Sequence, residues 1–307
     1  RESSVVLWLV PAYLTGSLMT AIYGSFRVFT ILLAARILWG ICFSFIRQAG
    51  IMTVVSASSD AHLGEHMGFY RGISSSGWFL GMFLAGLGHD LFGFTFTLLA
   101  FSLFSLASPP LGLLSQRGVH PIKTAPIKIT FAKGNLRIMF YGFAVGIVGL
   151  GLMMSTLGYI LKEQIGTSMN LSGRSIGIAT MTGAVLAIRW IFVGIGAPIM
   201  GAIADRIGRE RSIPILFVIG AIAQGLANLP FGPFWIIGGV FILFCCETLL
   251  DTLISARAGQ MGSRFVVSYV TAYDFGMALG PLIGWGIVQM GLPTNIIFFT
   301  GAIFYGF

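Results

Sequence analysis

Six ionisable side chains lie inside long apolar segments of this sequence. They are Arg36, Arg47, Arg189, Glu247, Asp251 and Asp274. At the centre of a lipid bilayer, each would cost roughly 2.5–3.5 kcal/mol if it stayed unpaired. Three are basic and three are acidic, so we expect them to pair or to face a water-filled cavity. Such groups could bind a proton, an ion or a charged solute.

The spacing of these residues places them on helical stripes. Arg36 and Arg47 are eleven residues apart, about three helical turns. Glu247 and Asp251 are four residues apart and share one face. Two neighbouring carboxylates resist ionising together, which favours proton binding by one of them.

We therefore predict that at least one of Glu247, Asp251 and Asp274 binds and releases a proton during function. Structural ion pairs between helices are the main alternative, and recognition of a solute without protons is another. For Arg189 the sequence leaves two roles open, a pair with an acid or a contact with an anionic solute. The Arg36 and Arg47 stripe could face the acidic pair.

The composition identifies the kind of protein that must hold these charges. The chain of 307 residues is 56% hydrophobic and 9% charged, with a mean hydropathy of +0.91. Soluble domains average about 25% charged residues, so this is an integral membrane protein. The net charge of +8 comes from residues scattered in short loops and predicts no nucleic-acid partner. We expect a lipid bilayer around the chain, no cofactor and no metal.

The fold class expected is an all-α polytopic membrane protein, because backbone groups in lipid must be satisfied within each segment. Ten apolar segments approach the length of about 20 residues needed to span a bilayer. They are Val5–Ile22, Phe29–Val55, Phe69–Leu91, Phe94–Leu114, Ile138–Ile160, Ile176–Ala204, Ile213–Leu229, Phe234–Ala256, Val266–Val288 and an incomplete Asn295–Phe307.

A basic stretch divides these segments into two groups. Residues 115–137 carry five Lys and Arg and no acid, which predicts a cytoplasmic linker. We expect helical bundles over residues 1–114 and 138–307. A weak internal repeat agrees with this, since Gly77-x-x-x-Gly81 in the first group matches Gly276-x-x-x-Gly280 in the second.

Three motifs resemble those of the major facilitator superfamily of secondary transporters. The charged hairpin between the sixth and seventh segments is similar to the family's motif between helices eight and nine. Arg36-x-x-x-Gly40 resembles a helix-four motif, and the stretch from Gly276 to Gly284 resembles the Gly-Pro motif of helix five or eleven. The hairpin residues are Gly201, Asp205, Arg206, Gly208, Arg209 and Arg211.

The resemblance implies a pseudo-symmetric two-bundle fold. Residues 1–114 would correspond to family helices three to six and residues 138–307 to helices seven to twelve. We expect the first two family helices and the end of the last to lie outside this sequence. The implied function is secondary active transport of a small solute by alternating access, with protons as the coupling ion.

Several details of this function stay open at the level of sequence. Export of drugs or metabolites and uptake of nutrients or organic acids are both compatible with the motifs. The expected setting is a monomer in the plasma or inner membrane. The charged hairpin would act as a cytoplasmic latch between the two bundles. A turn that only fixes topology is the alternative.

Small residues predict close helix contacts. Gly77, Gly81, Gly276, Gly280 and Gly284 form stripes that allow two helices to approach, and Pro281 favours a bend. These positions could form the contact between the two bundles, or simply pack tightly within one of them.

The sequence offers two alternatives to transport. His62-x-x-Glu65-His66 matches an inverted zinc-protease motif. The motif lies in an expected loop and lacks a third ligand, so we predict that the chain is not an enzyme. The other alternative is a receptor or sensor that has the transporter fold without transport.

Overall fold

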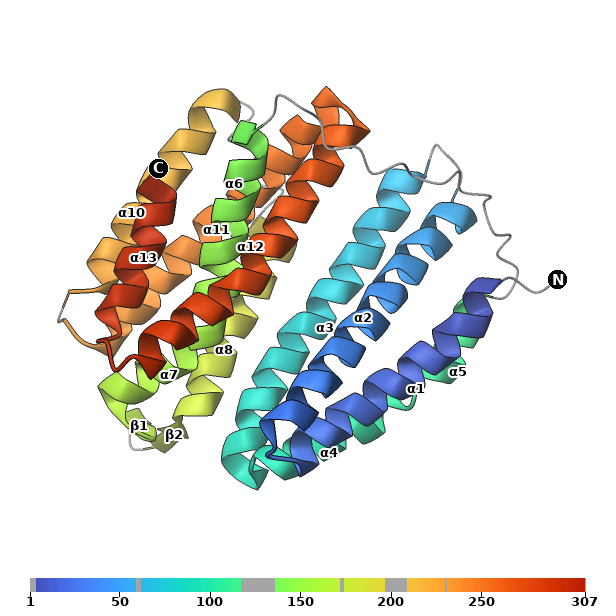
Figure 1. Ribbon diagram of the computed structural model, residues 1–307, viewed down its shortest axis with the longest axis horizontal. Coiled ribbons are helices and arrows are strands. Elements are labelled where there is room, and N and C mark those ends of the chain that lie inside the picture. The colour runs from blue at the N-terminus through green and yellow to red at the C-terminus, as the bar shows by residue number, and fades with distance from the viewer. Residues whose placement is uncertain are drawn as a thin grey trace. The chain divides into compact units, whose positions relative to one another are not determined.

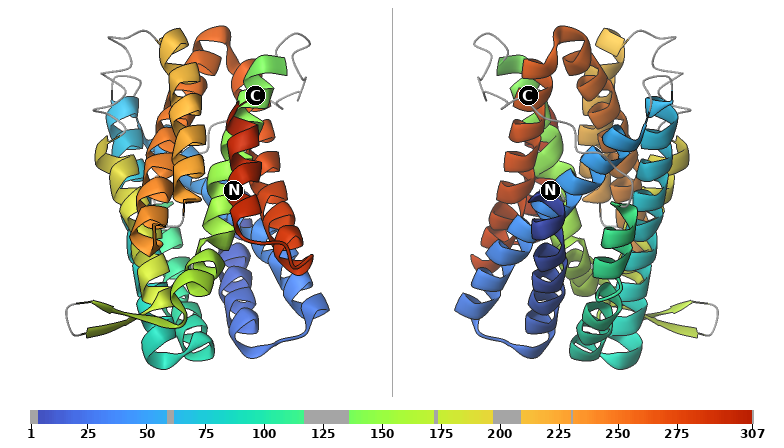
Figure 2. Two further views of the ribbon diagram at one scale, coloured as in Figure 1. Left: turned by 90° about the vertical axis from the view of Figure 1, so that its left-hand side faces the viewer. Right: turned by 90° about the vertical axis from the view of Figure 1, so that its right-hand side faces the viewer.

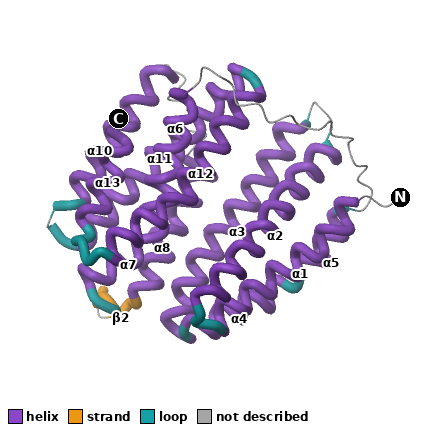
Figure 3. Tube along the Cα trace, viewed as in Figure 1, coloured by secondary structure: helices purple, strands orange, loops and turns teal. Residues whose placement is uncertain are grey.

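The computed structural model describes residues 4–58, 62–116, 136–171, 174–196, 209–229 and 231–306. Helices dominate this part of the chain, as the purple tube in Figure 3 shows. The chain forms two compact units (Figure 1). Unit 1 comprises Arg1–Gly77 and Leu84–Pro126, and unit 2 comprises Trp78–Phe83 and Ile127–Phe307.

Unit 1 contains helices from the first third of the chain. They are α1 (Ser4–Ser25), α2 (Phe29–Ala57), most of α3 (Leu63–Phe92), α4 (Phe94–Ser105) and α5 (Ser108–Ser115). Helix α1 packs against α2, α4 and α5. The α3–α4 turn needs Gly93, whose φ of 82° lies in the left-handed region that glycine adopts without strain.

Unit 2 begins with a helix that changes its winding. Helix α6 (Leu136–Gly146) continues as the π-helix η1 (Ile147–Met153) and then as α7 (Met154–Ile165). The other helices of this unit are α8 (Ile178–Ile191), the π-helix η2 (Phe192–Gly196), α10 (Arg209–Ala227), α11 (Pro233–Met261), α12 (Ser263–Gln289) and α13 (Asn295–Gly306). Single-turn π segments inside α-helices occur frequently at functional sites.

Helix α12 is the close neighbour of the α6–η1–α7 segment. It packs against all three parts, while α10 packs against α11 and α13. The core of unit 2 lies where these helices meet. Val145, Val148, Leu157, Leu243 and Leu250 are each fully buried there.

A short hairpin was not predicted from the sequence. Strands β1 (Ser168–Leu171) and β2 (Arg174–Gly177) pair antiparallel between α7 and α8. Figure 2 shows them projecting from the helices of unit 2. The sixth expected segment therefore begins in a strand at Ile176, because four residues are too few for hydropathy to separate a strand from a helix end.

Five helical stretches in the described residues are long and apolar enough to cross a membrane. They are Phe29–Ala57, Phe94–Ser115, Leu136–Ile165, Pro233–Met261 and Phe265–Gln289. Shorter apolar helices cover Ile178–Gly194, Arg211–Ala227 and Asn295–Gly306. Large apolar side chains also face outward, including Phe29, Phe104 and Leu136 with exposed fractions of 75%, 80% and 82%. An outer surface of this kind suits lipid, and the chain is a helical integral membrane protein.

Candidate functional site: a buried ion pair in unit 2

Three helices of unit 2 bring charged and polar side chains to one point in its core. Helix α8 supplies Arg189, α11 supplies Glu247 and α12 supplies Tyr273. The side chain of Arg189 is 5% exposed and that of Glu247 is 0% exposed. The described residues thus place two of the six predicted charges in direct contact.

The ion pair uses one oxygen of the carboxylate. The Nη2 and Nε atoms of Arg189 donate to Oε2 of Glu247 at 2.6 and 3.0 Å. The other oxygen, Oε1, accepts a hydrogen bond of 3.0 Å from the Tyr273 hydroxyl. Both oxygens of this buried carboxylate are therefore satisfied, as a charge without water requires.

The π-helix η1 makes room for the carboxylate. A Cβ atom on Gly149 would lie 2.5 Å from Cδ and 2.9 Å from Oε2 of Glu247, which no real side chain tolerates. Gly149 was not predicted as a site residue from the sequence. A signal was present in Gly149-x-Gly151, since two glycines within an apolar helix are unfavourable unless something packs closely against them.

Two aromatic rings flank the guanidinium group. The Cζ atom of Arg189 lies 4.9 Å from the ring centre of Trp190 and 5.4 Å from that of Phe244. The ring faces attract the cation electrostatically. One nitrogen of the guanidinium, Nη1, is buried without a hydrogen-bond partner in the described part of the chain, and so is Nε1 of Trp190.

A second acid lies one helical turn further along α11. Asp251 is half-buried and accepts a hydrogen bond of 2.6 Å from the Tyr269 hydroxyl on α12. The two tyrosines stand on one stripe of α12, with ring centres 6.1 Å apart. Each acid on α11 is therefore held by its own tyrosine on α12.

The remaining predicted charges lie elsewhere. Asp274 is half-buried on α12, directly after Tyr273. Arg36 and Arg47 are exposed on α2 of unit 1, where the Arg36 guanidinium lies 5.2 Å from the ring centre of Trp39. The charge partner of Glu247 in the described residues comes from its own unit.

The predicted glycine stripe of α12 packs within unit 2. A Cβ atom on Gly280 would lie 2.5 Å from the backbone of Gly151 in η1, and one on Gly284 would lie 2.6 Å from the Thr156 side chain in α7. Gly276 is equally close to the backbone of α6, and Pro281 lies inside the helix. By contrast, an added Cβ on Gly77 or Gly81 of α3 would meet no atom within 4 Å among the residues described.

Two predicted motifs fall partly outside the described residues. Of the charged hairpin, Gly201 to Gly208 lie outside them, α10 begins at Arg209, and Arg211 is exposed. The expectation that His62, Glu65 and His66 lie in a loop is wrong for the last two, because α3 begins at Leu63.

The histidine motif shows ordinary side-chain contacts. The rings of His62 and His66 are 6.2 Å apart, and His66 Nδ1 is hydrogen-bonded to the Ser58 hydroxyl at 2.8 Å. Within the described ranges, no three metal-binding side chains come together.

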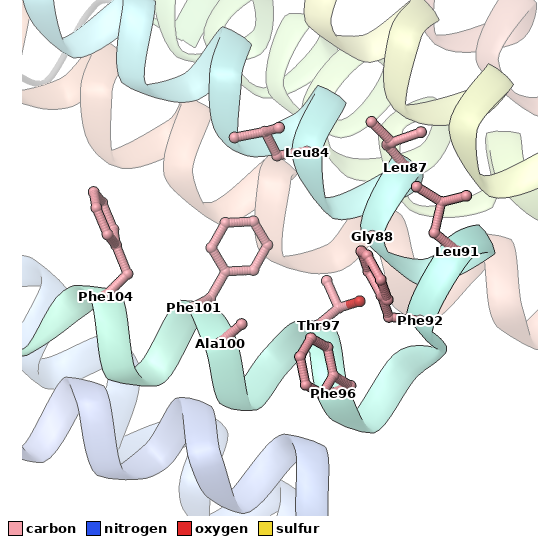
Figure 4. A pocket seen from close by; sticks show the side chains of 10 residues that line it. All are labelled: Leu84, Leu87, Gly88, Leu91, Phe92, Phe96, Thr97, Ala100, Phe101 and Phe104. Carbon is pink, nitrogen blue, oxygen red and sulfur yellow. The ribbon is translucent and has the colours of Figure 1, made fainter.

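An apolar pocket of about 300 Å³ lies between α3 and α4 (Figure 4). Its walls are Leu84, Leu87, Gly88, Leu91, Phe92, Phe96, Thr97, Ala100, Phe101 and Phe104. None of these side chains is charged, so the pocket offers only apolar contact and the Thr97 hydroxyl. The charged groups of the candidate site are Arg189 and Glu247 instead.

Comparisons with known proteins agree with this architecture. The Major Facilitator Superfamily model matches residues 3–281. Among solved structures, a POT family transporter in complex with 5-aminolevulinic acid aligns with a TM-score of 0.71 and 12% identity, over 98% of this chain and 82% of that chain.

Two further structures are similar. A POT family transporter with a thioalcohol-conjugated peptide has a TM-score of 0.66 and 13% identity, over 98% of this chain and 83% of that chain. The peptide transporter POT in complex with sulfate has a TM-score of 0.73 and 11% identity, over 99% of this chain and 78% of that chain. At these identities the likeness concerns the fold alone. No curated protein matches the sequence.

Proposed function

Because the chain belongs to the major facilitator superfamily, whose members are membrane transporters and not enzymes, we propose that it moves a small solute by alternating access and couples this movement to protons. The observation that carries the proposal is the ion pair of Arg189 and Glu247, buried in the core of unit 2. Ionisable groups inside a membrane are functional sites by default, since their burial is costly.

Glu247 has the surroundings that a proton carrier needs. Its negative charge is stabilised by Arg189, so the loss of that charge on protonation would leave a buried cation without a partner. Removing one partner of a buried pair typically costs about 3–5 kcal/mol. One proton could therefore shift the balance between two conformations of this unit by several kcal/mol.

The polar and charged side chains around Glu247 come from several helices of unit 2. Arg189 on α8 and Tyr273 on α12 donate hydrogen bonds to it, and Asp251 on α11 and Tyr305 on α13 are near enough to act on it electrostatically. The segment η1 contributes no titratable side chain. Because α8, α11 and α12 meet at one carboxylate, its protonation would weaken contacts among three helices at once.

The wider mechanism rests on the family membership. We propose that the hairpin of Asp205, Arg206 and Arg209 acts as a latch between two bundles and that the protein works as a monomer in the plasma or inner membrane. A purely structural ion pair is the alternative role for Arg189 and Glu247. It predicts that neutralising Glu247 changes stability but not the pH dependence of transport.

Transport by reconstituted protein separates these roles. Proteoliposomes would be tested for accumulation of radiolabelled 5-aminolevulinic acid, dipeptides, amino acids and monocarboxylates, with and without a pH gradient. We expect the gradient to drive accumulation of at least one solute. Glu247→Gln should abolish this drive but leave solute counterflow.

The matched control is Glu163→Gln, which neutralises an exposed glutamate at the end of α7. This variant should behave like the unmodified protein. Accumulation that ignores the gradient, or a Glu247→Gln variant with unchanged pH dependence, would refute the proton-carrier role.

A further inference from the structure

We infer that Arg189 is also the recognition point for a carboxylate group on the transported solute, which enters together with the proton that Glu247 takes up. The inference rests on the proposed function and names the class of solute, an organic acid. Its basis is that the site already holds a carboxylate, that of Glu247, at 2.6 Å from Arg189.

The guanidinium group has hydrogen-bonding capacity that the ion pair does not use. Two of its nitrogens, Nε and Nη2, donate to the same oxygen of Glu247. The third, Nη1, is buried and has no partner among the residues that the structure describes. Buried donors in folded proteins are almost always satisfied, so an unused charged donor calls for an acceptor. A carboxylate can take two N–H bonds from one guanidinium edge, which suits this donor set.

The guanidinium also cannot leave the site easily. It lies close to the rings of Trp190 and Phe244, and its side chain is only 5% exposed. When a proton neutralises Glu247, the positive charge of Arg189 therefore stays in the core. An acceptor must come to the arginine, because the arginine cannot turn to water.

Charge balance sets the stoichiometry. The resting pair of Arg189 and Glu247 is neutral. One proton on Glu247 adds one positive charge, and one solute carboxylate on Arg189 adds one negative charge. The loaded site is again neutral, so one carboxylate travels with one proton and no net charge moves. Proton and carboxylate should strengthen each other's binding by the same factor, as linkage requires.

The test compares acids with their amides, which have the same size and shape but no charge. Proteoliposomes containing the pH indicator pyranine would receive hydrophilic monocarboxylic acids with no other charged group, such as gluconate, or the matching amides. We expect at least one acid to acidify the interior at a rate tenfold or more above its amide. The rate should not change when valinomycin and potassium clamp the membrane potential.

Variants of the arginine complete the test. Arg189→Lys keeps the charge but loses the planar donor pair, and it should raise the half-saturating acid concentration at least tenfold. The double variant Arg189→Gln with Glu247→Gln removes both charges and should fold, yet it should lose acid-driven proton entry. Protein-free vesicles correct for acids that cross the lipid unaided.

The outcomes separate the two proposals. Proton entry driven equally by amides, or sensitive to the membrane potential, would overturn the carboxylate inference and leave proton-coupled transport standing. Acid transport that persists in the double variant would also overturn it. No proton movement with any solute, including those that the protein transports, would overturn the proposed function itself.

Discussion

Glu247→Gln tests the energetics of the buried pair most directly. Glutamine keeps the shape of the side chain and can still accept a hydrogen bond from Tyr273 through its oxygen. It removes the charge that compensates Arg189, whose side chain is 5% exposed. A buried charge that loses its partner destabilises a protein by about 3–5 kcal/mol.

The magnitude can be converted into a melting temperature. For chains of 150–250 residues, each kcal/mol shifts Tm by roughly 2–4 °C. We therefore expect Glu247→Gln to lower Tm by roughly 6–20 °C in detergent, as measured by intrinsic fluorescence under conditions of reversible unfolding. Arg189→Gln should have a similar effect, because it leaves a buried carboxylate without its cation.

The double variant decides whether the effect comes from the pair. Replacing both members of a buried ion pair with neutral groups is often close to neutral in stability. The variant with Gln at both Arg189 and Glu247 should thus regain most of the Tm lost by either single variant. If the two losses simply add, the residues act independently and the reasoning about a compensated pair is wrong.

Three further variants probe the surroundings of the pair. Gly149→Ala would force a methyl group against Glu247 and should lower stability by about 1–3 kcal/mol and abolish pH-driven transport, measured by melting and uptake. Gly280→Ala meets backbone of η1 and should sharply reduce the yield of folded protein, whereas Gly286→Ala, with open space beside it, should be tolerated in the same chromatographic assay. Tyr273→Phe removes one hydrogen bond and should cost about 0.5–1.5 kcal/mol in unfolding free energy by the same melt, and an unchanged Tm would contradict that role.

The helices were the part of the fold that hydropathy predicted well. All ten expected segments overlap helices in the described residues, because a membrane helix needs a long apolar run that is visible in sequence. The hairpin from Ser168 to Gly177 and the π segment η1 were missed. A four-residue strand has too few positions for a periodic signal, and a change of helical winding leaves the apolar run intact.

The sequence predicted the charged residues of the site but not which of them contact each other. Arg189 and Glu247 stood out as charges in apolar segments, and an acid was one of two partners foreseen for Arg189. Hydropathy cannot decide which acid pairs with Arg189, since Arg189 and Glu247 are 58 positions apart and lie on different helices. The four-residue spacing of Glu247 and Asp251 predicted that one of them binds a proton, and it gave no sign that each acid has its own tyrosine partner.

The π-helix η1 also fixes the rotational phase of the helix that contains it. Each residue of an α-helix turns the chain by about 100°, so winding seven residues more loosely rotates everything that follows relative to α6. Both ends of this segment nevertheless pack against the same helix, α12. Because η1 turns the chain less per residue, deleting one of its residues would restore ordinary winding and leave α7 facing α12, whereas ordinary winding of all seven residues would turn α7 away from it. The looser winding of η1 thus keeps the same face of the helix toward α12 both before and after the point where Glu247 packs against it.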